Sequence, residues 1–224
     1  MIETRRALHA VAEQLLAGDL WRRTGRIGLR VTPGGFGQPE TLLGDGRRRV
    51  RVECAPGHPV RLVILDGESE RYHELSTLAE AARFAGIELG APVGVYVPET
   101  DLAADTPLVL DTGAARRIAA WFALVEDALE EVRRRHAAHT PTITQLWPEH
   151  FDLACSMLAV NLGGSPGDAD HDEPYLYVGP QDLEGAPSAD RWNEPWGLSA
   201  PAAEVGSAAD AVRFFESSLD IVTG

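Results

Sequence analysis

The same order of sequence patterns occurs twice along the 224-residue chain. In each half an amphipathic helical pattern is followed by a strand-like segment that ends in Pro-x-x-Phe, first at Pro33 and Phe36 and again at Pro148 and Phe151. Further strand-like segments follow, and each half then closes with a short helical pattern, TLAEAARF in the first and SAADAVRF in the second. A recurrence of this kind indicates an internal duplication.

The recurrence also predicts how the chain divides. Residues 1–224 form a single compact domain in this interpretation, because the length suits one large domain or two small ones. Within that domain we expect two similar halves, 1–90 and 114–224, joined by 91–113. Each half is expected to contain a helix-strand-strand-helix unit.

The strand-like segments predict an α+β fold with mostly antiparallel sheet and flanking helices. RRRVRVE alternates in polarity, VRLVIL is nearly all apolar, and the turn signal CAPGHP joins them, so the two form a predicted hairpin. No repeated strand-helix-strand pattern occurs, which argues against a parallel α/β fold. We also expect a helix over 5–17 that stops at Gly18, and strands at 93–98, 107–110, 142–157 and 174–179.

The charges exclude some classes of partner. The net charge is −14, and residues 140–224 hold two arginines against fourteen acids. Such a segment repels nucleic acid and anionic membrane surfaces. No stretch approaches the ~20 apolar residues of a membrane span, and the first residues lack the apolar centre of a signal peptide. The sequence therefore predicts a soluble, cytoplasmic protein with neither nucleic acid nor membrane as partner.

Three segments carry a resemblance to a known family. LRVTPGGFG, LWPEHFDLA, and GGSPGD followed by EPYLYVGP resemble the hallmark segments of a family of uncharacterised proteins from high-GC bacteria. The resemblance covers most of the chain and implies a bacterial protein. It implies no function and no catalytic residues.

The run from Gly163 to Gly167 matches the Gly-x-Ser-x-Gly pattern of a nucleophile elbow. That elbow needs a backbone N–H on the residue after the serine to stabilise an oxyanion. The residue after Ser165 is Pro166, which has no N–H. We therefore interpret this run as a turn.

The acidic residues that follow offer a second possibility. Asp168, Asp170 and Asp172 have the spacing that opens an EF-hand loop, but Glu173 and Gly179 stand where that loop needs glycine and glutamate. The three carboxylates remain candidates for binding a hard cation. The alternative is a solvated acidic turn.

Histidines near carboxylates give the most specific hypothesis. His150 and Asp152 are two residues apart in an expected strand, so both side chains are predicted on one face. If that strand pairs with 174–179, His171 on the acidic loop could converge with them. An imidazole beside carboxylates suits a divalent metal or an acid–base pair, and a histidine bonded to a neighbouring carboxylate is the structural alternative. The catalytic candidates are His150, Asp152 and His171, and the metal-ligand candidates are His150, Asp152, Asp168, Asp170, His171 and Asp172.

Aromatic residues gather in the same part of the chain. They are candidates for lining a pocket, because a small-molecule site usually combines apolar walls with a few polar groups. Core packing is the alternative. The residues are Trp147, Tyr175, Tyr177, Trp192 and Trp196.

Three hypotheses of function follow, and the sequence does not decide whether the protein is an enzyme. The first is a protein that binds a small molecule, an ion or another protein through an acidic, aromatic-lined site in its C-terminal half. The second is a metal-assisted hydrolase, with a divalent cation as cofactor, that uses His150 and Asp152 with the carboxylates of 168–173. The third is a self-associating structural protein whose aromatic residues lie in a homodimer interface.

Overall fold

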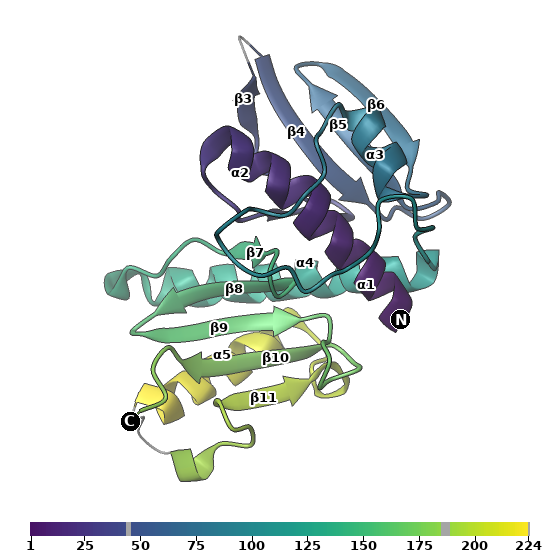
Figure 1. Ribbon diagram of the computed structural model, residues 1–224. Coiled ribbons are helices and arrows are strands. Elements are labelled where there is room, and N and C mark those ends of the chain that lie inside the picture. The colour runs from purple at the N-terminus through teal and green to yellow at the C-terminus, as the bar shows by residue number, and fades with distance from the viewer. Residues whose placement is uncertain (44–45, 185–188, 224) are drawn as a thin grey trace. The chain divides into compact units, whose positions relative to one another are not determined.

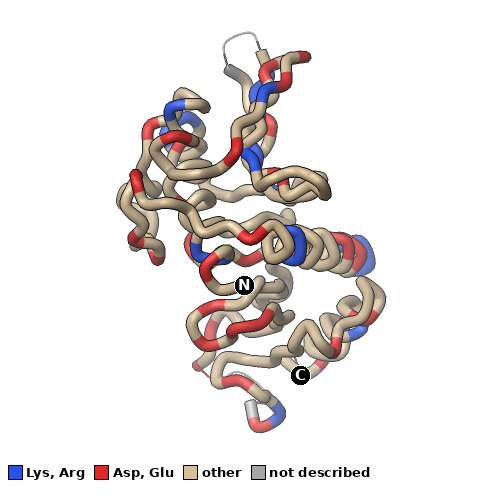
Figure 2. The backbone as a smooth tube through the Cα atoms, turned by 90° about the vertical axis from the view of Figure 1, so that its right-hand side faces the viewer, with Lys and Arg blue, Asp and Glu red and all other residues tan. Residues whose placement is uncertain are grey.

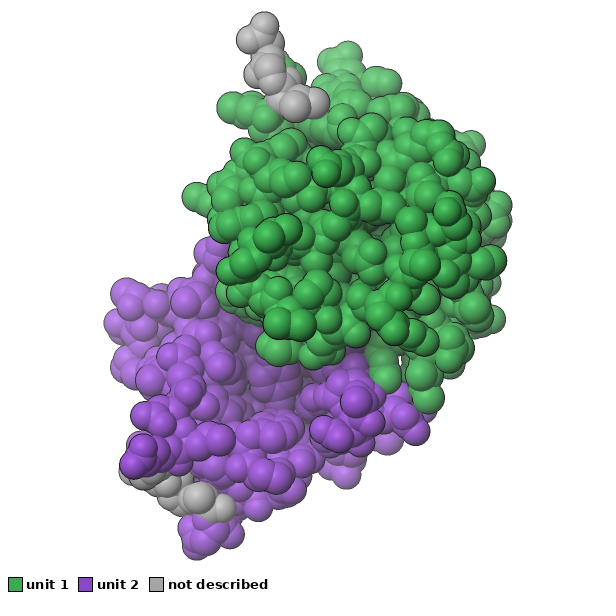
Figure 3. Space-filling view, in the orientation of Figure 1, with its two compact units in different colours: residues 1–120, 146–151 green, residues 121–145, 152–224 purple. Residues whose placement is uncertain are grey.

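The computed structural model describes residues 1–43, 46–184 and 189–223. The chain divides into two compact units, coloured separately in Figure 3. Unit 1 contains residues 1–120 and 146–151, and unit 2 contains 121–145 and 152–224. The described residues form helices and two antiparallel sheets, which confirms the predicted α+β class.

Unit 1 begins with one continuous helix that is longer than predicted. It runs through three segments: α1 (Ile2–Ala10), the π-helical η1 (Val11–Ala17) and α2 (Gly18–Thr24). The helix ends at Gly25, whose left-handed backbone (φ +69°) is typical of a helix C-terminus. Gly18 does not stop the helix, contrary to expectation. A Cβ atom there would lie 1.7 Å from the carbonyl oxygen of Gly90, so Gly18 permits a close approach of that segment.

The sheet of unit 1 has the strand order β1-β2-β4-β5-β6, with β3 paired to β4. The predicted hairpin is present as β4 and β5, in which Val50 lies opposite Ile64 and Val52 opposite Leu62. All four side chains are fully buried, and Figure 1 shows the long helix lying across one face of this sheet. The strands are β1 (Arg30–Thr32), β2 (Gly35–Gly37), β3 (Thr41–Leu43), β4 (Gly46–Glu53), β5 (Arg61–Asp66) and β6 (Ser69–Glu74).

After the sheet, α3 (Leu78–Ala85) is followed by a long irregular segment, residues 86–111. The strands expected at 93–98 and 107–110 are absent from it, because no neighbouring strand pairs with either stretch. Val93 and Val97 are 88% and 86% exposed. The segment is held to the long helix instead, for example by the N–H of Gly90, which donates to the carbonyl of Gln14 at 2.9 Å.

Unit 2 contains the second sheet, with the strand order β11-β10-β9-β8-β7. Helices α4 and α5 cover one of its faces (Figure 1), and a Cβ atom on Gly164 would lie 2.6 Å from Val125 of α4. The elements are α4 (Thr112–Arg135), of which residues 121–135 belong to unit 2, β7 (Gln145–Trp147), of which only Gln145 belongs to unit 2, β8 (Asp152–Met157), β9 (Val160–Ser165), β10 (Tyr175–Pro180), β11 (Leu198–Pro201) and α5 (Ala208–Thr223).

Side chains on the other face of this sheet point away from those helices. Tyr177 lies opposite Gly163 on one side and Ser199 on the other, and Gly163 lies opposite Ala154. Because directly opposed residues share a face of a sheet, these positions form one surface. We call it the tyrosine face; its residues are Asp152, Ala154, Gly163, Tyr175, Tyr177 and Ser199.

The strand expected over 142–157 is interrupted. β7 ends at Trp147, a turn occupies 148–151, and β8 begins at Asp152. Pro148 cannot donate a ladder hydrogen bond, and Phe151 has a left-handed backbone with φ +51°. The alternation of strand side chains therefore starts only at Asp152, and the prediction that His150 and Asp152 share a strand face is wrong.

The two units have the same order of elements. Each has a helix, a set of strands that pair in sequence order apart from β3, and a closing helix. The boundaries differ from the predicted halves, since residues 146–151 belong to unit 1. This common order is what a duplication would produce, and the duplication itself stays a prediction.

Both cysteines, Cys54 and Cys155, are buried thiols, and burial raises the pKa of each to about 12. Among the described residues, no helix has both the length and the apolar character that crossing a bilayer requires.

Candidate functional site

Three aromatic rings meet at the tyrosine face. Tyr175 and Tyr177 project from β10, and Trp196 comes from the loop that leads into β11. The ring centroids of the three pairs lie 6.1 to 6.4 Å apart, and Trp196 stands nearly perpendicular to Tyr177 at 89°. Gly163 makes room for this group, because a Cβ atom there would lie 2.5 Å from the Tyr177 ring.

Each tyrosine hydroxyl donates a hydrogen bond to a carboxylate. Tyr177 donates to Asp152, which is itself buried at the start of β8. Tyr175 donates to Oδ2 of Asp168 at 2.5 Å. Burial raises the pKa of both tyrosines above the usual value, and the neighbouring carboxylates raise it further. Both phenols therefore stay protonated and act as hydrogen-bond donors.

Asp168 organises the acidic loop as a turn. Its Oδ1 accepts hydrogen bonds from the backbone N–H groups of Asp170 and His171, at 2.9 and 2.8 Å. Burial alone would raise the pKa of Asp168, but the hydrogen bonds from Tyr175 and from these two N–H groups lower it below the usual value. Asp170 and Asp172 are exposed on the outside of the turn.

His171 lies between two carboxylates. Its Nε2 is 3.1 Å from Oε1 of Glu194, and its Nδ1 is 3.4 Å from Oδ1 of Asp168. The same oxygen of Glu194 accepts a 2.9 Å hydrogen bond from the hydroxyl of Ser199, and the imidazole lies 4.4 Å from the ring of Tyr175. Burial alone would lower the pKa of His171, but Glu194 and Asp168 raise it above its usual value. We call Asp168, His171 and Glu194 the histidine clasp.

The structure places two of the predicted site residues in the other unit. Trp147 ends β7 and His150 lies in the turn after it, both within unit 1. The His150 side chain is 68% exposed, and its Nδ1 is 3.8 Å from Oε1 of Glu99. Trp192 is partly exposed beside η3 (Ala189–Arg191). Of the five aromatic residues predicted to line a pocket, three lie together at the tyrosine face: Tyr175, Tyr177 and Trp196.

The predicted metal ligands do not gather. Within residues 1–43, 46–184 and 189–223, no group of three or more His, Cys, Asp or Glu side chains has an arrangement that could hold a metal ion. Asp168 and His171 do come together, but they bind each other, Glu194 and Tyr175. We therefore assign no divalent cation to these residues.

Sequence reasoning missed Glu194 and Ser199 of this site. Glu194 lies in an irregular loop with no periodicity, so only its position between Trp192 and Trp196 could have drawn attention to it. Ser199 is a short polar residue in an edge strand. Its position opposite Tyr177 depends on the pairing of β10 with β11, which the sequence does not indicate.

A second polar group in unit 1 was also missed. Glu13, in the π-helical segment, is fully buried and accepts hydrogen bonds from the N–H groups of Glu99 and Thr100 and from the Thr100 hydroxyl, at 3.1, 2.9 and 2.5 Å. One turn earlier, Nε2 of His9 donates to the carbonyl of Pro148 at 2.8 Å. Both residues thus fix irregular backbone to the long helix. Sequence patterns signal neither, since a glutamate in an amphipathic helix is normally solvated.

The negative charge of the protein is concentrated in unit 2. This unit has five arginines against seventeen aspartates and glutamates, whereas unit 1 has fifteen arginines against seventeen acids. Figure 2 marks the charged residues along the backbone. Unit 2 therefore carries a net charge of −12 out of the total of −14. A field of this sign attracts cations.

Comparison with protein-family models, with curated proteins and with solved structures found no match for this chain. The resemblance of its three hallmark segments to a family from high-GC bacteria accordingly stays a prediction.

Proposed function

We propose that the protein is a non-catalytic binding protein whose unit 2 recognises guanidinium or ammonium groups of a partner at the tyrosine face. The observation that carries this proposal is the contact of three aromatic rings with one another beside the carboxylates of the histidine clasp. Aromatic faces and carboxylates together are what proteins use to hold organic cations.

The charge distribution supports a cationic ligand. The net charge of −12 on unit 2 draws cations toward this unit over distances of a Debye length. Asp170, Asp172 and Glu173 are exposed on the loop that also carries Asp168. They place additional negative charge next to the aromatic rings.

The state of His171 argues against acid–base catalysis at this site. A general base needs a nitrogen lone pair that can reach a substrate proton. Both ring nitrogens of His171 face carboxylate oxygens, and the two carboxylates favour the protonated imidazole. The two residues named in the metal-assisted hydrolase hypothesis do not support it either, since His150 lies in an exposed turn and the Asp152 carboxylate binds the hydroxyl of Tyr177.

The proposal can be tested by calorimetric titration with a hexa-arginine peptide, and with free arginine to separate a polypeptide partner from a small molecule. We expect Trp196→Ala to weaken binding by about 0.5–2 kcal/mol, the usual contribution of a cation–π contact. Raising the salt from ~0.1 to ~1 M should weaken it further, because the Debye length falls from about 10 to about 3 Å.

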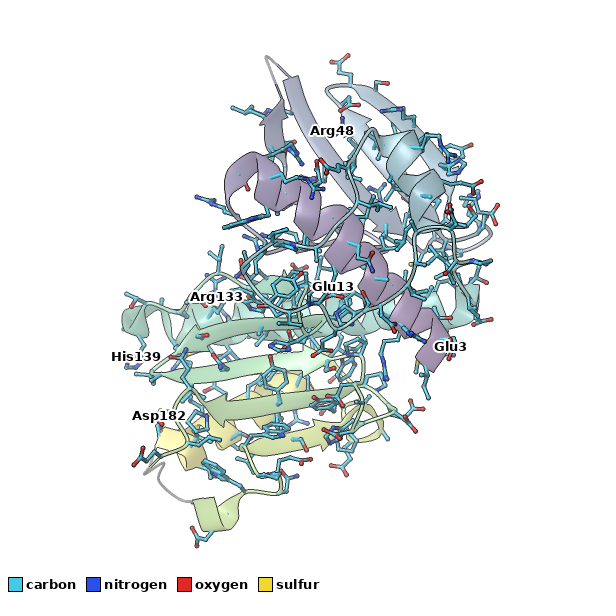
Figure 4. The ribbon with its side chains drawn as sticks, in the orientation of Figure 1. Glu3, Glu13, Arg48, Arg133, His139 and Asp182 are labelled. Atoms are coloured by element: carbon cyan, nitrogen blue, oxygen red, sulfur yellow. The ribbon has the colours of Figure 1, made fainter. Side chains whose placement is uncertain are left out.

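A matched pair of variants controls for charge. Asp170→Asn and Asp182→Asn each remove one exposed carboxylate of unit 2, but Asp182 lies beyond the opposite end of β10 (Figure 4). Only Asp170→Asn should reduce the affinity, by about 0.2–1 kcal/mol. The proposal is refuted if Asp170→Asn, Asp182→Asn and Trp196→Ala all bind with the same affinity. It is also refuted if neither hexa-arginine nor free arginine binds to the wild type.

A second candidate function, self-association, is favoured by the arginines of β4. Arg47, Arg49 and Arg51 alternate along β4 and so share a face of the unit 1 sheet. Arg47 and Arg51 have acidic partners within unit 1, Glu40 and Glu53, whereas the buried Nε of Arg49 has no hydrogen-bond partner among the described residues. Arg47, whose side chain is 72% exposed, is the arginine of this face that can reach the acidic unit 2 of a second copy. The molar mass by light scattering at ~0.1 and ~1 M salt tests this: a mass of one chain at both would exclude it.

A further inference from the structure

We propose that His171 acts as an internal cation that occupies the two carboxylates of the histidine clasp beside the tyrosine face, so that its deprotonation opens the site for a cationic partner. The proposal rests on the function proposed above and concerns the regulation of the same site. Its basis is the position of the imidazole between Glu194 at 3.1 Å and Asp168 at 3.4 Å.

Only the protonated imidazole presents an N–H to both carboxylates, as a hydrogen bond to Glu194 and as a longer ion-pair contact with Asp168. Carboxylates are hydrogen-bond acceptors, and a neutral imidazole has one N–H and one lone pair. After deprotonation, one of the two nitrogens presents its lone pair to a carboxylate oxygen, which is repulsive. One carboxylate of the clasp then loses its partner nitrogen and can accept a hydrogen bond from a ligand instead.

The surroundings of the ring determine the direction of the pH response. The groups that face it are Asp168 on its own loop, Glu194 on the loop before β11, and Tyr175 on β10. The exposed carboxylates of Asp170 and Asp172 flank it in sequence. Every charged group among these is negative, so each favours the imidazolium and moves the transition above the usual histidine value of about 6.5.

The clasp joins two segments that are distant in sequence. Asp168 belongs to the loop between β9 and β10, and Glu194 belongs to the loop that carries Trp196. The loop of Glu194 is additionally fixed to the sheet, since Asn193 bonds both the N–H and the carbonyl of Ser199 at 2.9 Å. Deprotonation should therefore free one carboxylate of the clasp without unfolding the face that binds the partner.

A guanidinium that enters this site replaces the imidazolium. The partner's N–H groups then bond the carboxylates, and His171 releases its proton to solvent. Binding of hexa-arginine should consequently strengthen as the pH rises through the His171 transition, by up to about tenfold for each pH unit by which the ligand shifts that transition. An electrostatic attraction that does not involve the clasp gives no such increase in affinity as the pH rises through this transition.

The experiment combines two readouts on the full chain between about pH 6 and 9, a range that extends upward from the usual histidine pKa of about 6.5. NMR of the histidine Cε1–H resonance follows the protonation of His171 without ligand, and calorimetry follows hexa-arginine binding. We expect the wild type to bind more tightly at high pH, His171→Gln to bind tightly at every pH, and His171→Arg to bind weakly at every pH. His136→Gln is the matched control: His136 pairs with Glu216 at 2.8 Å, elsewhere in unit 2, and its loss should leave the pH response unchanged.

The outcomes separate the two proposals. If the His171 transition lies above pH ~6.5 and falls in Glu194→Gln, but no variant binds the peptide, the clasp exists and the proposed binding function is wrong. If the peptide binds with the same pH dependence in the wild type and in His171→Gln, the binding function stands and the inference about His171 is overturned.

Discussion

Phe36 and Phe151 pack edge to face, with ring centroids 5.2 Å apart and an interplanar angle of 74°. They are the final residues of the two Pro-x-x-Phe segments, and both belong to unit 1. His9 also stacks on the ring of Phe151, with ring centroids 5.3 Å apart and an interplanar angle of 12°. The second segment thus completes the core of the unit that contains the first.

This contact predicts an energetic coupling between the two phenylalanines. Phe36→Leu and Phe151→Leu should each destabilise the protein, and the double variant should lose less than the sum of the two, because the ring–ring interaction is lost only once. We expect a coupling of about 0.5–1.5 kcal/mol from urea denaturation of the four proteins. Additive effects would show that the two rings are independent.

The buried carboxylate of Glu13 predicts a large loss of stability in Glu13→Ala. The N–H groups of Glu99 and Thr100 would lose their acceptor, and stranding buried donors of a charged hydrogen bond costs about 3 kcal/mol or more. Glu3→Ala is the matched control, because Glu3 is exposed near the start of the same helix (Figure 4). It should change the free energy of unfolding by less than about 1 kcal/mol. Similar losses in both variants would contradict the structural role of Glu13.

His9 predicts a dependence of stability on pH in the acid range. Burial lowers its pKa to about 4, against about 6.5 in the unfolded chain. Its contribution is fully present above pH ~6.5 and is lost as the pH falls toward 4, because the unfolded chain binds the proton first. The loss is on the order of 3 kcal/mol. Unfolding free energies of the wild type and His9→Gln between about pH 4 and 7 should converge as the pH falls; parallel curves would show that His9 does not titrate in this way.

The turn between β8 and β9 predicts a stabilising substitution. Leu158 and Ala159 form a two-residue loop with φ +53° and +58°, conformations that L-residues with side chains rarely adopt. Asn-Gly is the preferred pair for such a turn. Leu158→Asn with Ala159→Gly should therefore raise the stability by about 1–2 kcal/mol, measured as an increase in melting temperature. A decrease in melting temperature would mean that the exposed Leu158 side chain stabilises the protein by more than the backbone strain destabilises it.

Much of the fold could be predicted from local patterns. The β4–β5 hairpin followed from alternation and a turn signal, since this pattern records which side chains become buried. The strands expected at 93–98 and 107–110 failed because β-branched residues favour extended backbone without supplying a partner strand. Gly18 failed as a stop signal because the glycine serves a contact with Gly90, 72 positions later, which no local pattern records.

The candidate site could be predicted only in part. Asp168, His171, Tyr175, Tyr177 and Trp196 were found because acids and aromatics are concentrated in one stretch of sequence. The pairing of His150 with Asp152 failed because it assumed an unbroken strand, whereas the left-handed Phe151 separates the two residues. Glu194 was missed because its role depends on the geometry of a loop.

The assignment of residues 146–151 to unit 1 has a consequence for synthesis on the ribosome. Unit 1 lacks the partner of Phe36 and the hydrogen-bond acceptor of His9 until Pro148 and Phe151 have left the exit tunnel. The first 120 residues cannot finish folding as an independent N-terminal domain while the rest is translated, although domains usually fold in that order. Their core must wait for about thirty more residues, about half of them in helix α4, at a usual rate of about 5–20 residues per second. During those seconds the ring of Phe36 lacks the contact with Phe151 that it has in the folded protein.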